Sequence, residues 1–98
     1  MVRLVALWTK PADAETFERE YLRSHFPQLD RLENALDATV STCHDGPFFQ
    51  IAEVSFANVD DLYAALDTEL GKHVLESAQR LADAHGARIE VLVVGEAR

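Results

Sequence analysis

The 98-residue sequence has little cysteine and little glycine. Its single cysteine excludes an internal disulfide and a multi-cysteine metal site, and its four glycines form no Gly-rich phosphate loop. No two of the four histidines share one predicted element at metal-ligand spacing. We therefore expect no metal. Haem is disfavoured too, because only His25 suggests an axial ligand, and we expect no cofactor.

Basic residues are also scarce. The chain has 9 Lys and Arg against 17 Asp and Glu, a formal net charge of −8, and its basic residues form no cluster. Such a surface repels nucleic acid and anionic membranes, so neither is expected as a partner. The apolar run at residues 2–8 is interrupted by Arg3, is too short to span a membrane and lacks a signal-sequence cleavage site. We expect a soluble, cytoplasmic protein.

Hydrophobic residues, in contrast, make up 48% of the sequence, enough for a compact core with some left for an interface. Residues 1–98 suit a single domain, since no repeat, low-complexity segment or linker divides them. A chain of this length buries only about 60–65% of its unfolded surface. The core of a monomer alone would therefore give modest stability.

The first half of the chain predicts strand, helix and strand. Residues 2–8 are rich in branched and aromatic side chains, which favours a strand. Asp13 is a good helix N-cap, and Pro27 is expected to end that helix because residues before proline avoid the α region. Residues 29–34 are expected to be irregular, and residues 35–43 to form the second strand.

The second half predicts strand, helix and strand. An Asp-Gly turn at residues 44–47 leads into an alternating strand at residues 48–56. Asn58 is expected to cap a helix that is interrupted near residues 67–71 and continues to Gly86. Residues 88–96 form the last predicted strand. The order is β-α-β-β-α-β, which predicts one antiparallel sheet with both helices on one face.

The outer strands are apolar on both faces, which the helices on one face do not explain. In the first strand Val2, Leu4, Ala6 and Trp8 alternate with Val5 and Leu7; in the last, Ile89, Val91 and Val93 alternate with Leu92 and Val94. The uncovered sheet face therefore needs a partner, and a second copy is the simplest one. We predict a homodimer, with either Ile89, Val91 and Val93 or Leu92 and Val94 in the interface.

The helix at "FEREYLRSHFPQL" carries a recognisable motif. With the hairpin "GPFFQIAEVSF" and the helix "VLESAQRL", it resembles the EthD family of the dimeric α/β-barrel superfamily over nearly the whole chain. Phe17, Tyr21, His25 and Pro27 match the family's motif in place. The leucine expected directly after the proline is Gln28 here, and "ENAL" at residues 33–36 replaces the usual "PGL".

This resemblance implies an α+β, ferredoxin-like fold: a four-stranded antiparallel sheet with two helices on one face, paired with a second sheet into a dimeric α/β barrel. It also implies a small-molecule cleft between each sheet and its own helices. Relatives in the superfamily include cofactor-free monooxygenases, isomerases, polyketide cyclases and haem enzymes. The family name alone does not settle the chemistry.

His25 and Tyr21 are the candidate catalytic residues. Their spacing of four places them on one helical face, with Phe17 one turn earlier. Histidine titrates near neutral pH and can take up and return a proton, while the tyrosine can orient it or a substrate oxygen. Alternatively, His25 is a cation at the helix end and Tyr21 belongs to the core.

The inward faces of the predicted elements suggest how the cleft is lined. Gln50 lies among apolar neighbours and either gives a ligand one hydrogen bond or bonds to nearby backbone. Trp8 either lines the cleft mouth or fills core. Glu53, inside an apolar strand, faces solvent, pairs across the dimer or acts as a base. The substrate-binding residues we expect are Phe17, Gln50, Phe56, Leu66 and Trp8.

Two classes of function fit these residues. One is a small cofactor-independent enzyme, of the oxidoreductase or the cyclase or isomerase type, that acts on an apolar or aromatic organic molecule with His25 as acid and base. The other is a non-catalytic ligand-binding protein of an oxidative catabolic or biosynthetic pathway.

Overall fold

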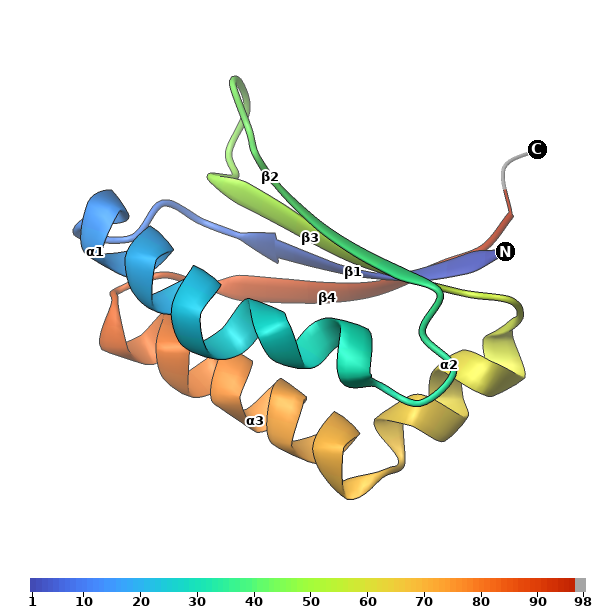
Figure 1. The fold of residues 1–98 in the computed structure, drawn as a ribbon. Coiled ribbons are helices and arrows are strands. Elements are labelled where there is room, and N and C mark those ends of the chain that lie inside the picture. Colours follow the sequence, from blue (N-terminus) through green and yellow to red (C-terminus); the bar gives the residue numbers. More distant parts are fainter. Residues whose placement is uncertain (97–98) are drawn as a thin grey trace.

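A computed structural model describes residues 1–96 and shows a twisted four-stranded antiparallel sheet with helices packed against one face (Figure 1). The strands are β1 (Val2–Trp8), β2 (Asp37–Thr42), β3 (Gln50–Phe56) and β4 (Ile89–Val94), in the spatial order β2-β3-β1-β4. The helices are α1 (Ala14–Glu20), α2 (Val59–Leu66) and α3 (Glu69–Ala84). The ferredoxin-like α+β fold predicted from the sequence is confirmed.

The strand register sorts side chains onto the two faces of the sheet. Leu4 of β1 lies opposite Val54 on one side and Val93 on the other, and Trp8 lies opposite Gln50 and Ile89. Burial alternates along β3, where every second residue from Gln50 to Phe56 is buried under the helices. This confirms the alternation predicted for the third strand, because period two places alternate side chains on one face.

The segment after α1 differs from the prediction that Pro27 ends the helix. Asp13 caps α1 as expected, accepting a hydrogen bond from the Thr16 amide at 3.2 Å. The chain then widens into a π-helical turn, η1 (Tyr21–His25), and continues as a 3₁₀ helix, η2 (Phe26–Arg31), into the segment expected to be irregular. Proline is tolerated near the start of a new helical segment, where its missing N–H leaves no hydrogen bond unmade.

The break between α2 and α3 is confirmed. Asn58 caps α2 by accepting from the Asp61 amide at 2.8 Å, and Thr68 caps α3 by accepting from the Gly71 amide at 3.0 Å. Gly71 packs so closely on the end of α2 that a Cβ there would lie 2.7 Å from the Leu66 Cα. Gly86, with a φ of 68°, follows the end of α3 in the left-handed conformation that favours glycine.

β4 is an edge strand with apolar side chains on both faces. Its register places Ile89, Val91 and Val93 on the helix side and Leu92 on the open side, opposite Val5. Val91, Leu92 and Val93 are 41–45% exposed. On the open face, Arg3 and Glu53 form an ion pair at 3.3 Å. Glu53 thus lies on the open face beside a basic residue of its own chain, and its pairing across a dimer and its role as a base stay predictions.

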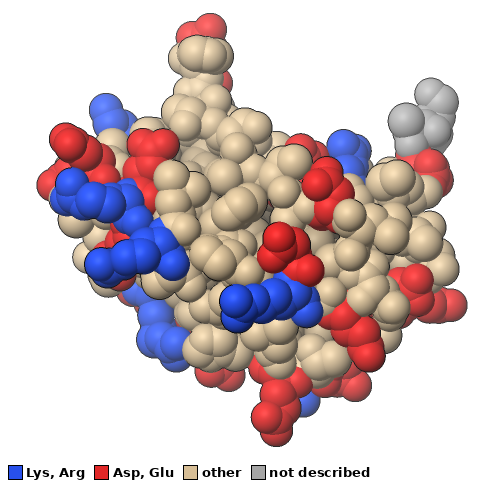
Figure 2. Space-filling model, viewed as in Figure 1, with Lys and Arg blue, Asp and Glu red and all other residues tan. Residues whose placement is uncertain are grey.

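Charged side chains are mixed on the surface. On the face shown in Figure 2, Lys and Arg side chains lie interspersed with the more numerous Asp and Glu side chains. Within residues 1–96, no helix has the length and apolar character needed to cross a membrane.

Candidate functional site

Three aromatic side chains meet between the sheet and the first helical segment. Trp8 ends β1, and Tyr21 and His25 occupy the first and last positions of the π-helical turn. The ring centroid of Tyr21 lies 5.5 Å from that of Trp8 and 5.2 Å from that of His25, and the Trp8 and His25 centroids lie 6.1 Å apart. The structure thus brings together both predicted catalytic residues and one predicted binding residue.

Two of these side chains bury a polar atom without a partner. Within the described residues, neither the Trp8 indole nitrogen nor the Tyr21 hydroxyl makes a hydrogen bond, although both side chains are fully buried. Burial raises the pKa of Tyr21, so its hydroxyl keeps its proton and remains a donor. Buried donors normally have partners, so these two groups are exceptions among the described residues.

His25 is 5% exposed and neutral near pH 7. Burial, followed by the charge of nearby His73, lowers the pKa of His25 from 6.5 to about 4. Its Nδ1 lies 3.1 Å from the hydroxyl oxygen of Ser77 on α3. A buried, neutral imidazole in a helical segment that continues to Arg31 does not fit the alternative of a cation at a helix end.

The low pKa of His25 predicts a loss of stability in acid. Between about pH 6.5 and 4 the unfolded chain binds a proton that the folded chain does not, so the stability linked to this group is complete above pH 6.5 and is lost as the pH falls through 4. The difference corresponds to about 3 kcal/mol. The free energy of unfolding is measured in urea at pH 7 and at pH 4. Its decrease between the two should be larger by about that amount in the native protein than in His25→Gln. Equal decreases would contradict the low pKa.

An apolar cavity of about 40 Å³ borders the cluster. We call it the interior cavity; Trp8, Tyr21 and His25 line it together with aliphatic side chains from the sheet and α3. Among those are Leu75 and Val91, which are both partly exposed, so the cavity reaches the surface between α3 and β4. Its volume holds only a few waters, and a ring-sized ligand requires it to widen.

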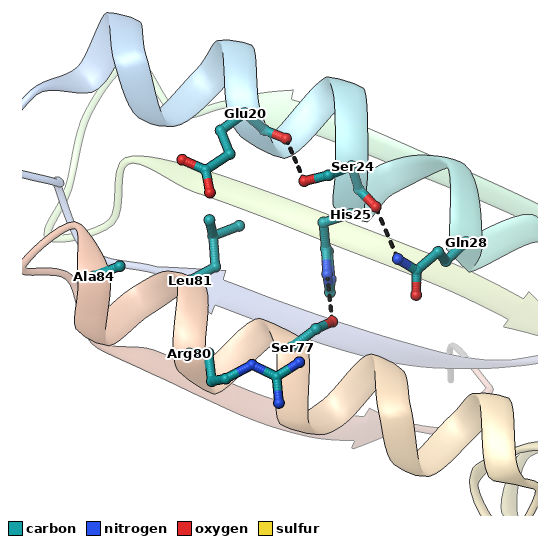
Figure 3. A pocket seen from close by; sticks show the side chains of 8 residues that line it. All are labelled: Glu20, Ser24, His25, Gln28, Ser77, Arg80, Leu81 and Ala84. Atoms are coloured by element: carbon teal, nitrogen blue, oxygen red, sulfur yellow. Dashed lines mark hydrogen bonds between the residues drawn. The ribbon is translucent and has the colours of Figure 1, made fainter.

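A larger, polar hollow lies on the other side of His25. This depression has a volume of about 300 Å³ and runs between the α1–η1 segment and α3 (Figure 3). His25 and Ser77 meet across it, with Glu20 and Ser24 on one wall and Arg80 on the other. His25 lines both the polar depression and the interior cavity.

The other predicted binding residues do not line the interior cavity, and only Phe17 and Gln50 lie beside the cluster. Phe17 is fully buried, with its ring centroid 5.3 Å from that of Trp8. Gln50 is buried opposite Trp8, and its amide nitrogen has no partner within residues 1–96. Phe56 and Leu66 pack in the core, Phe56 about 20 Å further along β3 from Gln50. Their roles in binding stay predictions.

Ser77 was not predicted from the sequence. A signal for it exists, because Ser77 follows Val74 by three residues and precedes Leu81 by four, which places a hydroxyl on the buried stripe of an amphipathic helix. Such a serine has many ordinary explanations, such as a bond to the carbonyl one turn earlier. Only the folded structure shows that it meets a histidine 52 positions away.

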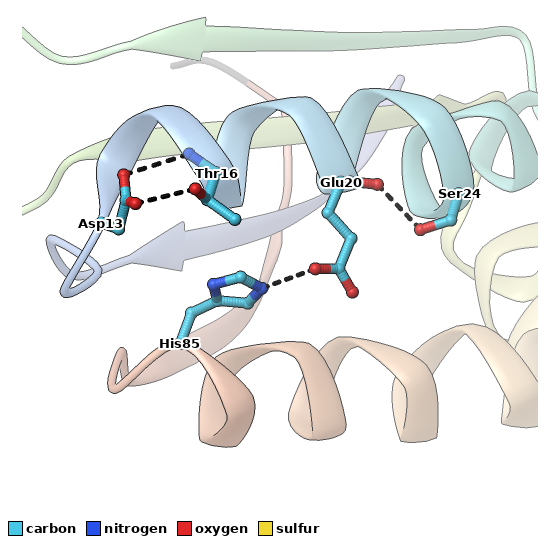
Figure 4. A network of polar contacts seen from close by, with 5 residues as sticks. All are labelled: Asp13, Thr16, Glu20, Ser24 and His85. Atoms are coloured by element: carbon cyan, nitrogen blue, oxygen red, sulfur yellow. Dashed lines mark hydrogen bonds and ion pairs between the residues drawn. The ribbon is translucent and has the colours of Figure 1, made fainter.

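A second histidine, His85, connects α1 and α3 at the C-terminal end of α3. His85 Nε2 lies 2.8 Å from a carboxylate oxygen of Glu20, and so joins the end of α3 to α1 (Figure 4). In the same view Asp13 holds Thr16, and these hydrogen bonds lower the pKa of the Asp13 carboxyl. Among the described residues, no three His, Cys, Asp or Glu side chains come together as a metal site would require.

The fold and this site together define a small ferredoxin-like α+β protein with a neutral histidine beside a small apolar cavity. No family model matches the sequence, and no curated protein matches it significantly. Solved structures do. An EthD family protein from Bacillus halodurans superposes with a TM-score of 0.89, 22% identity and 99% of each chain covered.

Two further likenesses are more distant. SnoaB from Streptomyces nogalater, described as a cofactor-independent oxygenase, gives a TM-score of 0.69 at 19% identity over 99% of this chain and 93% of its own. An antibiotic biosynthesis monooxygenase gives 0.63 at 13% identity, with both chains covered completely. At these identities the comparisons show the fold. The predicted resemblance to EthD proteins is thus confirmed as a shared fold.

Proposed function

We propose that this protein is a small cofactor-independent enzyme that binds an apolar or aromatic organic molecule between sheet and helices and moves a proton with His25. The observation that carries the proposal is that Trp8 and Tyr21, which each bury a donor without a partner, line one cavity together with the neutral imidazole of His25. A base needs an acceptor nitrogen, and the anion it creates needs donors placed where charge develops.

The proposed step is a proton transfer. An unprotonated nitrogen of His25 takes a proton from an acidic C–H or O–H bond of the substrate, whose electron pair stays on the substrate as an enolate or phenolate. The Tyr21 hydroxyl and the Trp8 N–H stabilise that oxyanion by donating to it. The anion then regains a proton at another atom, as in an isomerisation or cyclisation. In an oxygenation, its carbon instead forms a C–O bond to molecular oxygen, and the resulting peroxide anion takes the proton back from His25 to give a hydroperoxide.

SnoaB, a protein of this fold, is described as a cofactor-independent oxygenase, and this supports oxygenation as a reaction that the fold allows. The aliphatic lining of the interior cavity supports an apolar substrate. Because the cavity is small, entry requires α3 and β4 to part at Leu75 and Val91, where the lining already meets solvent. We place the protein in the cytoplasm, as the sequence predicts.

The test begins with the ligand. Protein purified from its own host is analysed by native mass spectrometry, and the retained organic molecule is offered to ligand-free protein with and without dioxygen. Conversion of the molecule supports the enzyme. Tight binding without any conversion overturns the catalytic proposal and leaves the ligand-binding accessory protein, the alternative that the same cavity would serve.

We further propose a homodimer formed through the open face of the sheet, where Val5 and Leu92 lie side by side. An interface between two such sheets should bury well over 1,000 Å² in total. Light scattering at micromolar concentration should give twice the chain mass, and Leu92→Lys should give the monomer because it places a charge in the interface. A control on the helix side of the molecule, Leu22→Lys, should stay dimeric; a monomeric native protein would contradict the proposal.

A further inference from the structure

We propose that Ser77 is a positioning residue that holds the proton of His25 on Nδ1 and leaves Nε2 as the basic nitrogen. The inference rests on the proposed function for its catalytic meaning, but the tautomer itself is a property of the resting protein. Ser77 lies on α3, and its hydroxyl oxygen is 3.1 Å from His25 Nδ1 and 3.1 Å from the carbonyl oxygen of Val74.

Counting hydrogens decides the direction of each bond. A serine hydroxyl carries one hydrogen, and the Val74 carbonyl can only accept, so both contacts of Ser77 are hydrogen bonds only when that hydrogen goes to Val74. The Ser77 oxygen is then an acceptor toward His25, and Nδ1 has to supply the hydrogen. A neutral imidazole has a single N–H, so Nε2 keeps its lone pair.

The surroundings of the ring favour the same tautomer. Within residues 1–96 the Ser77 hydroxyl is the hydrogen-bond partner of His25, and it reaches the ring from the polar depression. With the proton on Nε2, the Ser77 hydroxyl would have to donate to Nδ1, and its hydrogen bond to the Val74 carbonyl would be lost. An unmade hydrogen bond at a buried group is costly, so this arrangement is disfavoured.

In the proposed reaction the two ring nitrogens of His25 therefore have different roles. When a substrate proton moves to Nε2, the Nδ1–H···Ser77 bond holds the ring in place and strengthens as the imidazolium forms, because its donor is then charged. When Nε2 returns the proton, the starting tautomer is restored. The net change at His25 and Ser77 over one cycle is zero.

The tautomer can be read directly by ¹⁵N NMR of protein labelled at histidine, without any substrate. The native protein at pH 7 should show a protonated Nδ1 and an unprotonated Nε2 for His25. Ser77→Ala should lose this preference, and Ser77→Thr, which keeps the hydroxyl, should retain it. The matched control is Ser24→Ala: Ser24 lines the same depression but donates to the Glu20 carbonyl, and its loss should leave the His25 signals unchanged.

Turnover gives a second measurement. Ser77→Ala should lower kcat by about ten- to a hundred-fold with little change in KM, because the ring loses its orienting partner while the cavity keeps its lining. A proton found on Nε2 in the native protein, or His25 signals that Ser77→Ala leaves unmoved, overturns the inference. If the tautomer is as stated and His25→Gln turns over normally, the proposed function fails and the assignment of Ser77 stands.

Discussion

Replacing His25 with glutamine is expected to lower turnover by about 10²–10⁴ while the fold and the oligomeric state persist. Glutamine fills much of the imidazole's volume and can still bond to Ser77, but it has no nitrogen that takes up a proton. The measurement is kcat on the substrate identified from the host, with native mass and thermal unfolding recorded on the same samples. Undiminished turnover by a folded variant would remove His25 from the mechanism.

Two further variants sharpen this result. His44→Gln is the matched control, since His44 is exposed in the loop between β2 and β3, and its turnover should equal that of the native protein. Tyr21→Phe should cost less than His25→Gln, because it removes one donor and keeps the ring that stacks against its neighbours. The double variant should be little worse than His25→Gln alone, because the two groups act on one step.

Replacing Gly71 with alanine is expected to lower the free energy of unfolding by about 2–4 kcal/mol. Helix propensity alone would favour alanine by about 1 kcal/mol, so a measured loss identifies packing as the cause. The added Cβ would overlap the Ala65 carbonyl oxygen and lie 2.9 Å from the Leu66 carbonyl carbon. Both are backbone atoms, so α2 and α3 have to move apart.

Thermal and urea unfolding measure this effect, with the midpoint falling by roughly 10–20 °C. Gly95→Ala is the control, because nothing lies within 4 Å of a Cβ at that position, and its stability should stay within about 0.5 kcal/mol of the native value. Equal stability of the two variants would show that the chain relieves the contact at Gly71 without cost.

Local rules predicted the fold where one physical cause dominates. Alternation in β3 follows from burial of one face, and the caps at Asp13 and Asn58 follow from side chains that satisfy free amides at a helix start. The rule that failed was the one for Pro27. The residue before a proline disfavours helix, but here the helical path continues past Pro27. The widened turn at Tyr21–His25 lets a new helical segment begin at Phe26.

The site was predictable in part for a similar reason. Helical spacing places Phe17, Tyr21 and His25 next to one another whatever the rest of the fold does. Their rings remain neighbours although the helix widens at Tyr21. Ser77 comes from a distant helix, and its contact depends on how α3 is set against η1. Cavity volume is also a property of the whole fold, since it depends on how side chains from several strands and helices fit together.

The edge strand β4 has a consequence for how the chain is made and handled. Its outer backbone groups have no strand beside them within residues 1–96, and its residues Val91, Leu92 and Val93 are exposed. An exposed apolar edge strand can pair with the edge strand of another chain. Aggregation should therefore rise with protein concentration and during rapid expression, and slow, cool expression should raise the yield of soluble protein.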